Sequence, residues 1–123
     1  MMDVSDLANV FPTQTHEVGA VLFRQGDTDS DGFIMQLGRV ELSRQIGDVT
    51  QSGLFIEQGQ IFGVYKTIFE NERRYFTYTF TQKARITRIP EQVLKDWIAA
   101  SEPFIICCIR NWPNLGDRLI GDA

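Results

Sequence analysis

Short apolar or alternating segments fill the middle of the chain, from His16 to Pro90, and most of them end near a glycine or an aspartate. They are rich in β-branched and aromatic residues, which favour half-buried strands. Gly38 stands between two of these segments and predicts a turn there. The predicted strands cover residues 18–23, 33–37, 40–44, 54–56, 75–81 and 85–89. Many short strands separated by turn residues predict an antiparallel sandwich or barrel.

Helical patterns flank this β-region on both sides. Residues 4–10 have apolar positions at a spacing of three and predict a short helix that ends before Pro12. The pattern becomes helical again after Pro90, where one apolar stripe is formed by Val93, Leu94, Trp97 and Ile98. We therefore predict one mainly β domain over residues 1–123. It has a β-roll at about 16–90, C-terminal helices at about 91–112 and a tail at 113–123.

The last predicted helix, residues 104–112, is apolar on more than one side. Its large apolar residues are Phe104, Ile105, Ile106, Ile109 and Trp112. One edge of a sandwich can cover only one of these sides, and exposed apolar patches usually mark an interface. We therefore expect a homodimer or a complex with another protein subunit. The alternative is that the helix folds back over the roll as a lid.

Charge and hydropathy exclude several partners. The chain has 12 Lys and Arg against 16 Asp and Glu, a formal net charge of −4. Proteins that bind nucleic acid normally carry a basic surface, so we do not expect nucleic acid as a partner. The longest apolar run, residues 104–109, is far shorter than the ~20 residues that span a bilayer. The chain also lacks the basic start of a signal peptide, so we expect a cytoplasmic protein without a membrane span.

Metal and catalytic sites are not expected either. His16 is the single histidine, and the two cysteines, Cys107 and Cys108, are adjacent, so the chain lacks a zinc-binding pattern and a disulfide framework. Residues 27–32 (DTDSDG) resemble the start of a calcium loop, but the position that needs an acid at its end is Gly38. We therefore interpret this run as a solvated turn. No nucleophile with a base is visible. We expect no enzyme, no catalytic residue, no metal and no resident cofactor.

Residues 59–77, GQIFGVYKTIFENERRYFT, are the segment that points to a ligand. A glycine turn leads into about one turn of helix. Backbone N–H groups at the start of a short helix can bind an anion. An arginine from the same segment could hold a phosphate with two parallel hydrogen bonds. The alternative is that Arg73 and Arg74 are exposed on a solvated hairpin beside Glu70 and Glu72.

Three stretches resemble the cyclic nucleotide-binding domain family. They are HEVGAVLFRQGDTDSDGFIMQLGRVELSR at 16–44, GQIFG at 59–63 and RYFT at 74–77. The resemblance covers about residues 16–100, including the spacing of the glycines. It implies an eight-stranded jelly roll with an N-terminal helical piece, a short phosphate-cassette helix and C-terminal helices that act as a lid or a dimer contact.

The ligand site departs from the pattern of that family. Val64 replaces a glutamate that binds the ribose 2′-hydroxyl in the family, and Tyr75 and Phe76 replace small residues. With one extra residue allowed in the cassette, Arg74 matches the phosphate arginine and Thr77 the hydroxyl position after it. The candidate ligand-binding residues are Phe62, Gly63, Val64, Tyr65, Arg74, Tyr75, Phe76 and Thr77.

Two functions follow from this comparison. The first is a regulatory module whose site is degenerate for cyclic AMP and cyclic GMP and which acts through protein–protein interaction or dimerisation. The second is a genuine sensor of a cyclic mono- or dinucleotide, bound around Gly63 and Arg74. A DNA-binding regulator would need a helix-turn-helix after the lid helix, and only residues 113–123 follow Trp112, so we expect no DNA-binding domain in this chain.

Two orientations can be predicted in this segment. Side chains alternate along a strand, so only one of Tyr75 and Phe76 should point into the roll, where it would fill the ligand space. We also expect Arg74, rather than Arg73, to face that space.

Overall fold

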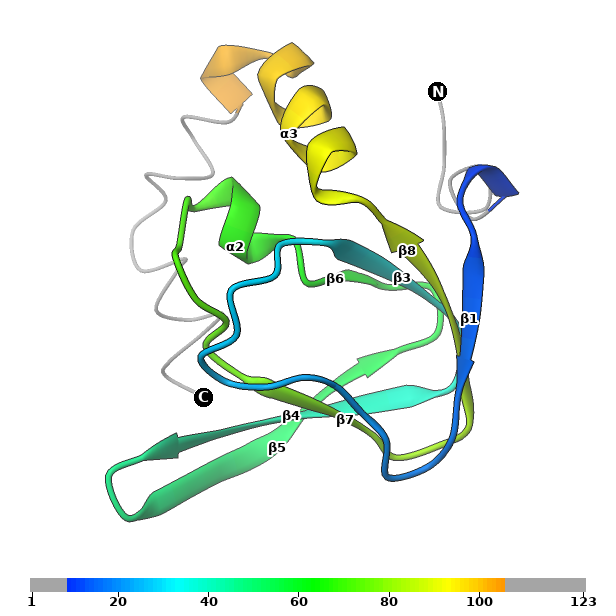
Figure 1. Ribbon diagram of the computed structural model, residues 1–123, viewed down its shortest axis with the longest axis vertical. Coiled ribbons are helices and arrows are strands. Elements are labelled where there is room, and N and C mark those ends of the chain that lie inside the picture. The colour runs from blue at the N-terminus through cyan, green and yellow to red at the C-terminus, as the bar shows by residue number, and fades with distance from the viewer. Residues whose placement is uncertain (1–8, 106–123) are drawn as a thin grey trace.

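Two four-stranded antiparallel sheets pack face to face in the computed structural model, which describes residues 9–105 (Figure 1). One sheet has the strand order β1-β8-β3-β6 and the other has β2-β7-β4-β5. The strands are β1 (Thr13–His16), β2 (Val21–Phe23), β3 (Gly32–Leu37), β4 (Arg39–Ile46), β5 (Val49–Glu57), β6 (Ile61–Phe62), β7 (Thr77–Phe80) and β8 (Ala84–Ile89). The predicted fold class, a mainly β antiparallel roll of jelly-roll type with a C-terminal helix, is confirmed.

Several strand boundaries differ from the prediction. β1 was not expected because its sequence, TQTH, is polar, and it exists because it pairs with β8 from Thr13↔Thr87 to His16↔Ala84. β2 begins only at Val21, after a turn in which Gly19 has a φ of 89°. β5 extends well beyond residues 54–56, because β4 supplies a partner along most of its length. Tertiary pairing, rather than local hydropathy, sets these boundaries.

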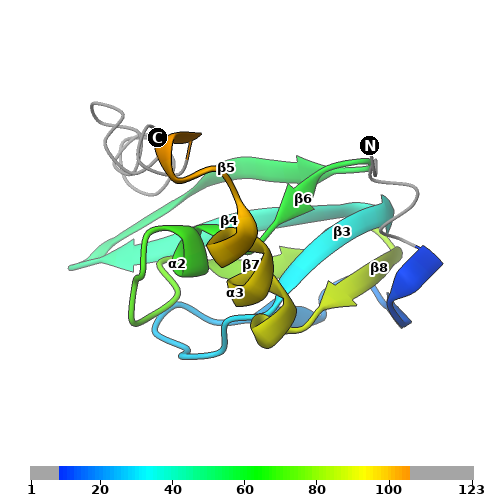
Figure 2. The same ribbon diagram turned by 90° about the horizontal axis from the view of Figure 1, so that it is seen from above.

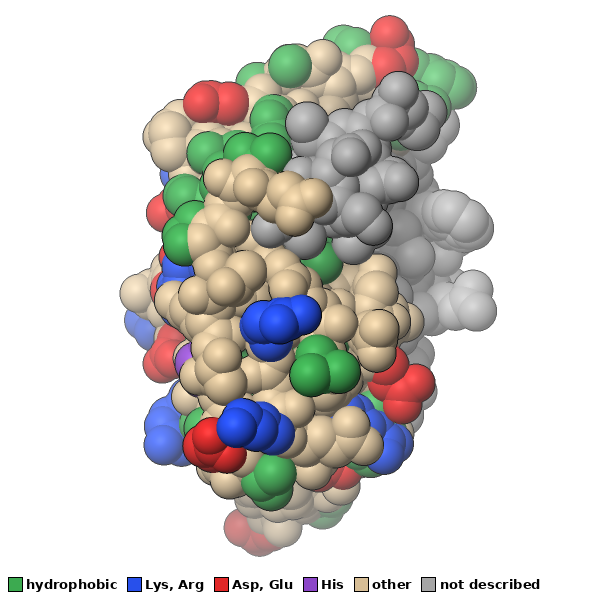
Figure 3. All heavy atoms as spheres, turned by 90° about the vertical axis from the view of Figure 1, so that its right-hand side faces the viewer, with side chains coloured by type: hydrophobic (Ala, Val, Ile, Leu, Met, Phe, Trp, Pro, Cys, Tyr) green, Lys and Arg blue, Asp and Glu red, His purple; other side chains and the backbone are tan. Residues whose placement is uncertain are grey.

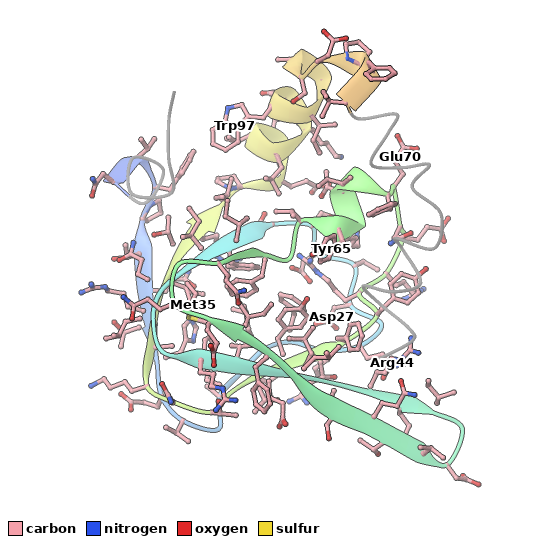
Figure 4. All side chains as sticks on the ribbon, turned by 180° about the vertical axis from the view of Figure 1, so that it is seen from behind. Asp27, Met35, Arg44, Tyr65, Glu70 and Trp97 are labelled. Carbon is pink, nitrogen blue, oxygen red and sulfur yellow. The ribbon has the colours of Figure 1, made fainter. Side chains whose placement is uncertain are left out.

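The core lies between the two sheets and is rich in aromatic side chains. Phe33 and Phe62 from one sheet contact Phe23 and Tyr78 from the other, in two pairs whose ring centroids are each 5.8 Å apart. Met35 points into the same space, where it is fully buried (Figure 4). The members of this core are Phe23, Phe33, Met35, Val40, Leu42, Phe62, Phe76, Tyr78, Phe80, Ala84 and Ile86.

Two helices cover one end of the roll. α2 (Tyr65–Ile68) connects β6 to β7, and α3 (Glu91–Ala100) follows β8 directly. Figure 2, a view from above, shows them side by side in front of the sheets. Leu94 of α3 is buried with Ile34 and Ile89 in a second, smaller cluster, so α3 is held on the outer side of β3 and β8. No described helix is long and apolar enough to cross a membrane.

The two flanking helices predicted at the ends are described only in part. Asn9, Val10 and residues 103–105 are helical. Residues 4–8 and 106–112 lie outside the described residues, and so do Ile106, Ile109 and Trp112 of the predicted interface. Figure 3 shows positive and negative side chains interspersed on the face that carries β1, with hydrophobic side chains gathered towards the α3 end.

Candidate functional site

Two loops that are far apart in the sequence lie side by side at one end of the roll (Figure 1). We call residues 24–31, between β2 and β3, the acidic turn, and residues 63–76, between β6 and β7, the cassette. The N–H of Gly26 donates to the carbonyl of Arg74 at 2.8 Å, and the N–H of Arg74 donates to the carbonyl of Asp27 at 2.8 Å. This pair of backbone bonds places the Arg74 side chain between the two loops.

Arg74 is buried, with 5% of its surface exposed, and its guanidinium is bonded to the protein itself. Nη1 donates to the carbonyl of Gly63 at 2.6 Å, and Nη2 donates to the carbonyl of Asp31 at 2.7 Å. Asp29 accepts the other two bonds, from Nη2 at 2.9 Å and from Nε at 3.4 Å. The guanidinium also lies over the ring of Phe23, 4.1 Å from its centroid. A carboxylate of the chain therefore occupies the fork that could hold a phosphate.

Gly63 is held in a conformation that only glycine adopts easily. Its φ is +77°, and a Cβ would lie 3.0 Å from the Phe33 ring and 3.3 Å from Nη1 of Arg74. This close approach allows the Gly63 carbonyl to accept the bond from Arg74. A glycine at this position therefore makes the hydrogen bond between the Gly63 carbonyl and Arg74 possible.

Asp31 links the cassette to α3. Its carbonyl accepts the bond from Arg74, and its carboxylate accepts one from Nη1 of Arg88 at 2.7 Å. The other carboxylate oxygen accepts from the backbone N–H of Glu91, the first residue of α3, at 2.9 Å. One short loop therefore holds both the buried arginine and the start of the C-terminal helix.

Val64 faces the helix and not an open site. It packs against the cluster of Ile34, Ile89 and Leu94. A Cβ added at Gly32 would lie 2.9 Å from Leu94 and 3.0 Å from Val64, so the two side chains meet over that glycine. Val64 thus extends the apolar surface on which α3 packs. Phe62, another candidate, is 1% exposed and belongs to the main core.

Tyr75 and Phe76 alternate as predicted. Phe76 is 5% exposed and belongs to the main core, whereas Tyr75 is 43% exposed. The Thr77 hydroxyl accepts a bond from the backbone N–H of Gln25 at 3.0 Å. In the described residues the side chains of Phe76 and Thr77 are therefore both engaged by the protein.

A small hollow remains beside Arg74, with a volume of about 20 Å³. That volume is enough for about one water molecule. The hollow is lined by Gly63, Tyr65, Lys66, Asn71, Arg73, Arg74, Tyr75, Phe76 and Tyr78. Figure 4 shows Tyr65, the first residue of α2, on the side of the helix that faces the roll. Arg74 reaches this space from a buried position, whereas Arg73 is exposed and donates to the Gly26 carbonyl at 3.0 Å, although both arginines line the hollow.

Burial disfavours the ionised form of two phenols of the hollow, those of Tyr65 and Tyr78. Desolvation raises the pKa of Tyr65. Desolvation also raises the pKa of Tyr78, an effect that Arg74 opposes in part. Both hydroxyls are therefore proton donors at neutral pH.

A second groove, of about 420 Å³, is lined in part by residues of the acidic turn. Its lining includes the side chains of Asp27, Asp29 and Arg88, and Arg88 is already paired with Asp31. The groove has the volume for a nucleotide, but its carboxylates would repel a phosphate.

The sequence analysis did not identify Asp29, Asp31, Lys66, Asn71 or Tyr78 as site residues. The DTDSDG run was interpreted as a solvated turn, and nothing in its composition indicates that two of its aspartates hold a buried arginine network. For Tyr78 a signal existed, because it is two residues after Phe76 on the same side of β7. No cluster of metal-ligating side chains is present in residues 9–105.

Most of the chain matches a known protein family. The cyclic nucleotide-binding domain matches residues 13–101 of the chain. The chain belongs to the cyclic nucleotide-binding domain family. The resemblance found in the sequence is thereby confirmed at the level of the family. No curated protein sequence matches the chain.

Solved structures show the same fold at low sequence identity. The cyclic AMP-bound form of the EAL enzyme Bd1971 is 17% identical with a TM-score of 0.77, and the match covers 89% of this chain and 29% of that one. The catabolite activator protein of Thermus thermophilus is 20% identical with a TM-score of 0.66, over 94% and 53% of the two chains. A transcriptional regulator from Thermotoga maritima is 17% identical with a TM-score of 0.69, over 96% and 95%. This cyclic nucleotide-binding domain therefore spans only part of the length of some structural relatives.

Proposed function

We propose that this domain is a non-catalytic regulatory module that has lost cyclic AMP and cyclic GMP binding and acts through contact with another protein or a second copy of itself. The observation that carries the proposal is the Arg74 network. Arg74 is 5% exposed, and its guanidinium already donates to Asp29, Asp31 and Gly63. A phosphate would have to displace the Asp29 carboxylate, which already holds the fork of the buried arginine.

The space beside Arg74 supports the same function. A hollow of about 20 Å³ cannot take a nucleotide unless Phe76 leaves the core. Removing a large aromatic side chain from a core costs about 3–5 kcal/mol. Val64 supplies no acceptor for a ribose hydroxyl, and a hydroxyl left unpaired in a buried site costs about 1–3 kcal/mol.

The contact surface in this proposal is the C-terminal side of α3. Trp97, Phe104 and Ile105 are 39%, 70% and 51% exposed. Burying a large apolar side chain contributes about 1.5–3 kcal/mol, so these residues favour association. Sedimentation velocity should show a mass that rises with concentration or a subunit that co-purifies. Phe104→Ser should weaken the association, and Val18→Ser, an exposed valine in the turn before β2, is the control. A clean monomer at all concentrations, without a second subunit, would contradict this part.

Nucleotide binding is tested by calorimetry and thermal unfolding with cyclic AMP, cyclic GMP and cyclic di-GMP at millimolar concentration. A ligand present at 100 times its Kd stabilises the folded state by about 2.7 kcal/mol. We expect no heat of binding and an unchanged melting temperature with cyclic AMP and cyclic GMP. A saturable rise with either one overturns the proposed loss of binding.

The second candidate is a sensor of a cyclic mono- or dinucleotide. It is favoured by the match in fold to Bd1971 in its cyclic AMP-bound form. In that case Arg74 must exchange Asp29 for a phosphate. A saturable response that Arg74→Ala abolishes and Arg73→Ala retains would establish this function.

A further inference from the structure

The groove of about 420 Å³ carries charged side chains of both signs. Two carboxylates, Asp27 and Asp29, and one guanidinium, Arg88, line it. A volume of this size is typical of a small-molecule site, in which a few polar groups orient an apolar body. The remaining lining residues are Leu22, Phe23, Thr28 and Phe33. The groove therefore suits a small ligand that carries both a positive and a negative group.

Three consecutive residues, Asp27, Thr28 and Asp29, form what we call the acidic wall of the groove. All three are exposed. Asp27 accepts a bond from the backbone N–H of Arg24 through Oδ2 at 2.8 Å, and it has no ion pair within residues 9–105. Asp29 holds Arg74, but its side chain is still 39% exposed. An ammonium has three N–H donors, and the acidic wall offers three side chains whose oxygens can accept them.

Arg88 provides the positive group of the groove, and its position is fixed by the protein. Nη1 donates to Asp31 at 2.7 Å, and Nη2 donates to Oε1 of Gln14 at 3.4 Å. The guanidinium also lies over the ring of Phe33, 5.1 Å from its centroid. An arginine has five N–H donors, so three are not used by the described residues. Because the side chain is 35% exposed, these donors can reach a carboxylate in the groove.

We propose that this groove binds a free α-amino acid with an apolar side chain. The ammonium of the ligand bonds to the acidic wall, its carboxylate bonds to Arg88, and its side chain packs on Leu22, which is half-buried at the apolar side of the groove. A zwitterion has no net charge, so it fits a lining that would repel a phosphate. The inference goes beyond the proposed function, because both the ligand and the side chains differ from those beside Arg74.

The two charged groups predict which relatives of the ligand are rejected. N-acetyl-leucine lacks the ammonium, and leucinamide lacks the carboxylate. The loss of a hydrogen bond between charged groups should weaken binding by about tenfold or more. Glycine keeps both charges but has no side chain for Leu22, so it should also bind more weakly than leucine.

The test is a titration of the full chain with L-leucine, followed by ¹H–¹⁵N NMR and calorimetry. We expect saturable shifts at residues 22–33 and at Arg88. N-acetyl-leucine and leucinamide, whose amine stays mostly protonated at neutral pH, should bind at least about tenfold more weakly. The carboxylate contact is tested on the ligand rather than at Arg88, because Arg88 also pairs with Asp31. Equal binding of all three compounds, or tighter binding of leucinamide, would overturn the proposal.

A pair of aspartate variants tests the acidic wall. Asp27→Asn keeps an oxygen for the backbone N–H of Arg24 and should weaken leucine about tenfold. Asp48→Asn, a change at an exposed aspartate between β4 and β5, is the matched control and should leave the affinity unchanged. Shifts that do not saturate, that spread beyond the groove or that persist equally in Asp27→Asn would contradict this inference. None of these results would affect the proposed loss of cyclic nucleotide binding, which is measured separately.

Discussion

Arg74 and Asp29, which are 45 residues apart in the sequence, form an ion pair with two contacts, at 2.9 and 3.4 Å. The arginine side chain is 4% exposed and the aspartate side chain is 39% exposed. The positive charge is thus buried, and its counter-charge comes from a loop that solvent reaches. The pair ties the cassette to the acidic turn, and Asp31 continues the connection to α3.

Asp29→Asn should destabilise the fold. The change leaves the buried guanidinium of Arg74 without its counter-charge, at an expected cost of about 1–3 kcal/mol, less than for a fully buried pair. Urea unfolding measures this difference. Glu17→Gln removes the exposed contact with Lys83, at 3.7 Å, and should change the free energy of unfolding by less than about 0.5 kcal/mol. Equal effects of the two changes would refute the structural role of Asp29.

Substitution by lysine should lower the free energy of unfolding much more at Arg74 than at Arg73. Arg74→Lys keeps the charge but loses the fork that reaches Asp29, Asp31 and Gly63, and should cost about 3 kcal/mol. Arg73 is exposed and makes one bond to the Gly26 carbonyl, so Arg73→Lys should cost below about 1 kcal/mol. Chemical denaturation of both variants gives the comparison, and an Arg74→Lys protein as stable as the parent would contradict it.

Gly38→Ala should be among the most destabilising changes at a turn. Gly38 has a φ of +100°, and a Cβ would lie 2.6 Å from the Lys83 carbonyl and 2.7 Å from Cα of Ala84. Backbone strain of about 1–2 kcal/mol then adds to overpacking of about 1–3 kcal/mol. At Gly47 the φ is +58° and the space is open, so Gly47→Ala should cost only the strain. Thermal unfolding should rank the two variants in that order.

His16 should make the stability depend on pH. Its ring stacks on Phe80 at 4.6 Å, and desolvation, followed by the charge of Arg88, lowers the pKa of His16 below 6.5. The unfolded chain then binds this proton more readily than the folded chain does. The contribution of His16 to stability is therefore complete above pH 6.5 and is lost as the pH falls through the folded-state pKa.

The His16 prediction is checked by denaturation at a series of pH values and by NMR titration of the ring, which is the single histidine of the chain. His16→Phe keeps an aromatic ring on Phe80 and should remove this step. A folded-state pKa above 6.5 would contradict the expected direction.

The sequence by itself determined the fold class, the turn at Gly38 and the fact that Tyr75 and Phe76 point to opposite sides. Each of these depends on a local rule: β-branched and aromatic runs between turn residues, a backbone conformation open to glycine, and the two-residue period of a strand. Such rules act between neighbours in the chain, and the tertiary structure did not override them here.

Only the tertiary structure decided what Arg74 does. Its partners Asp29 and Asp31 are 45 and 43 residues away, in a turn whose composition is that of a solvated loop. The polar strand β1 likewise exists because β8 supplies its hydrogen bonds. In both cases a polar group is stabilised by a partner that is distant in the sequence, and hydrogen bonds and ion pairs depend on distances of about 3 Å in space. Neighbouring residues carry no information about such distances, so these features had to be found in the folded chain.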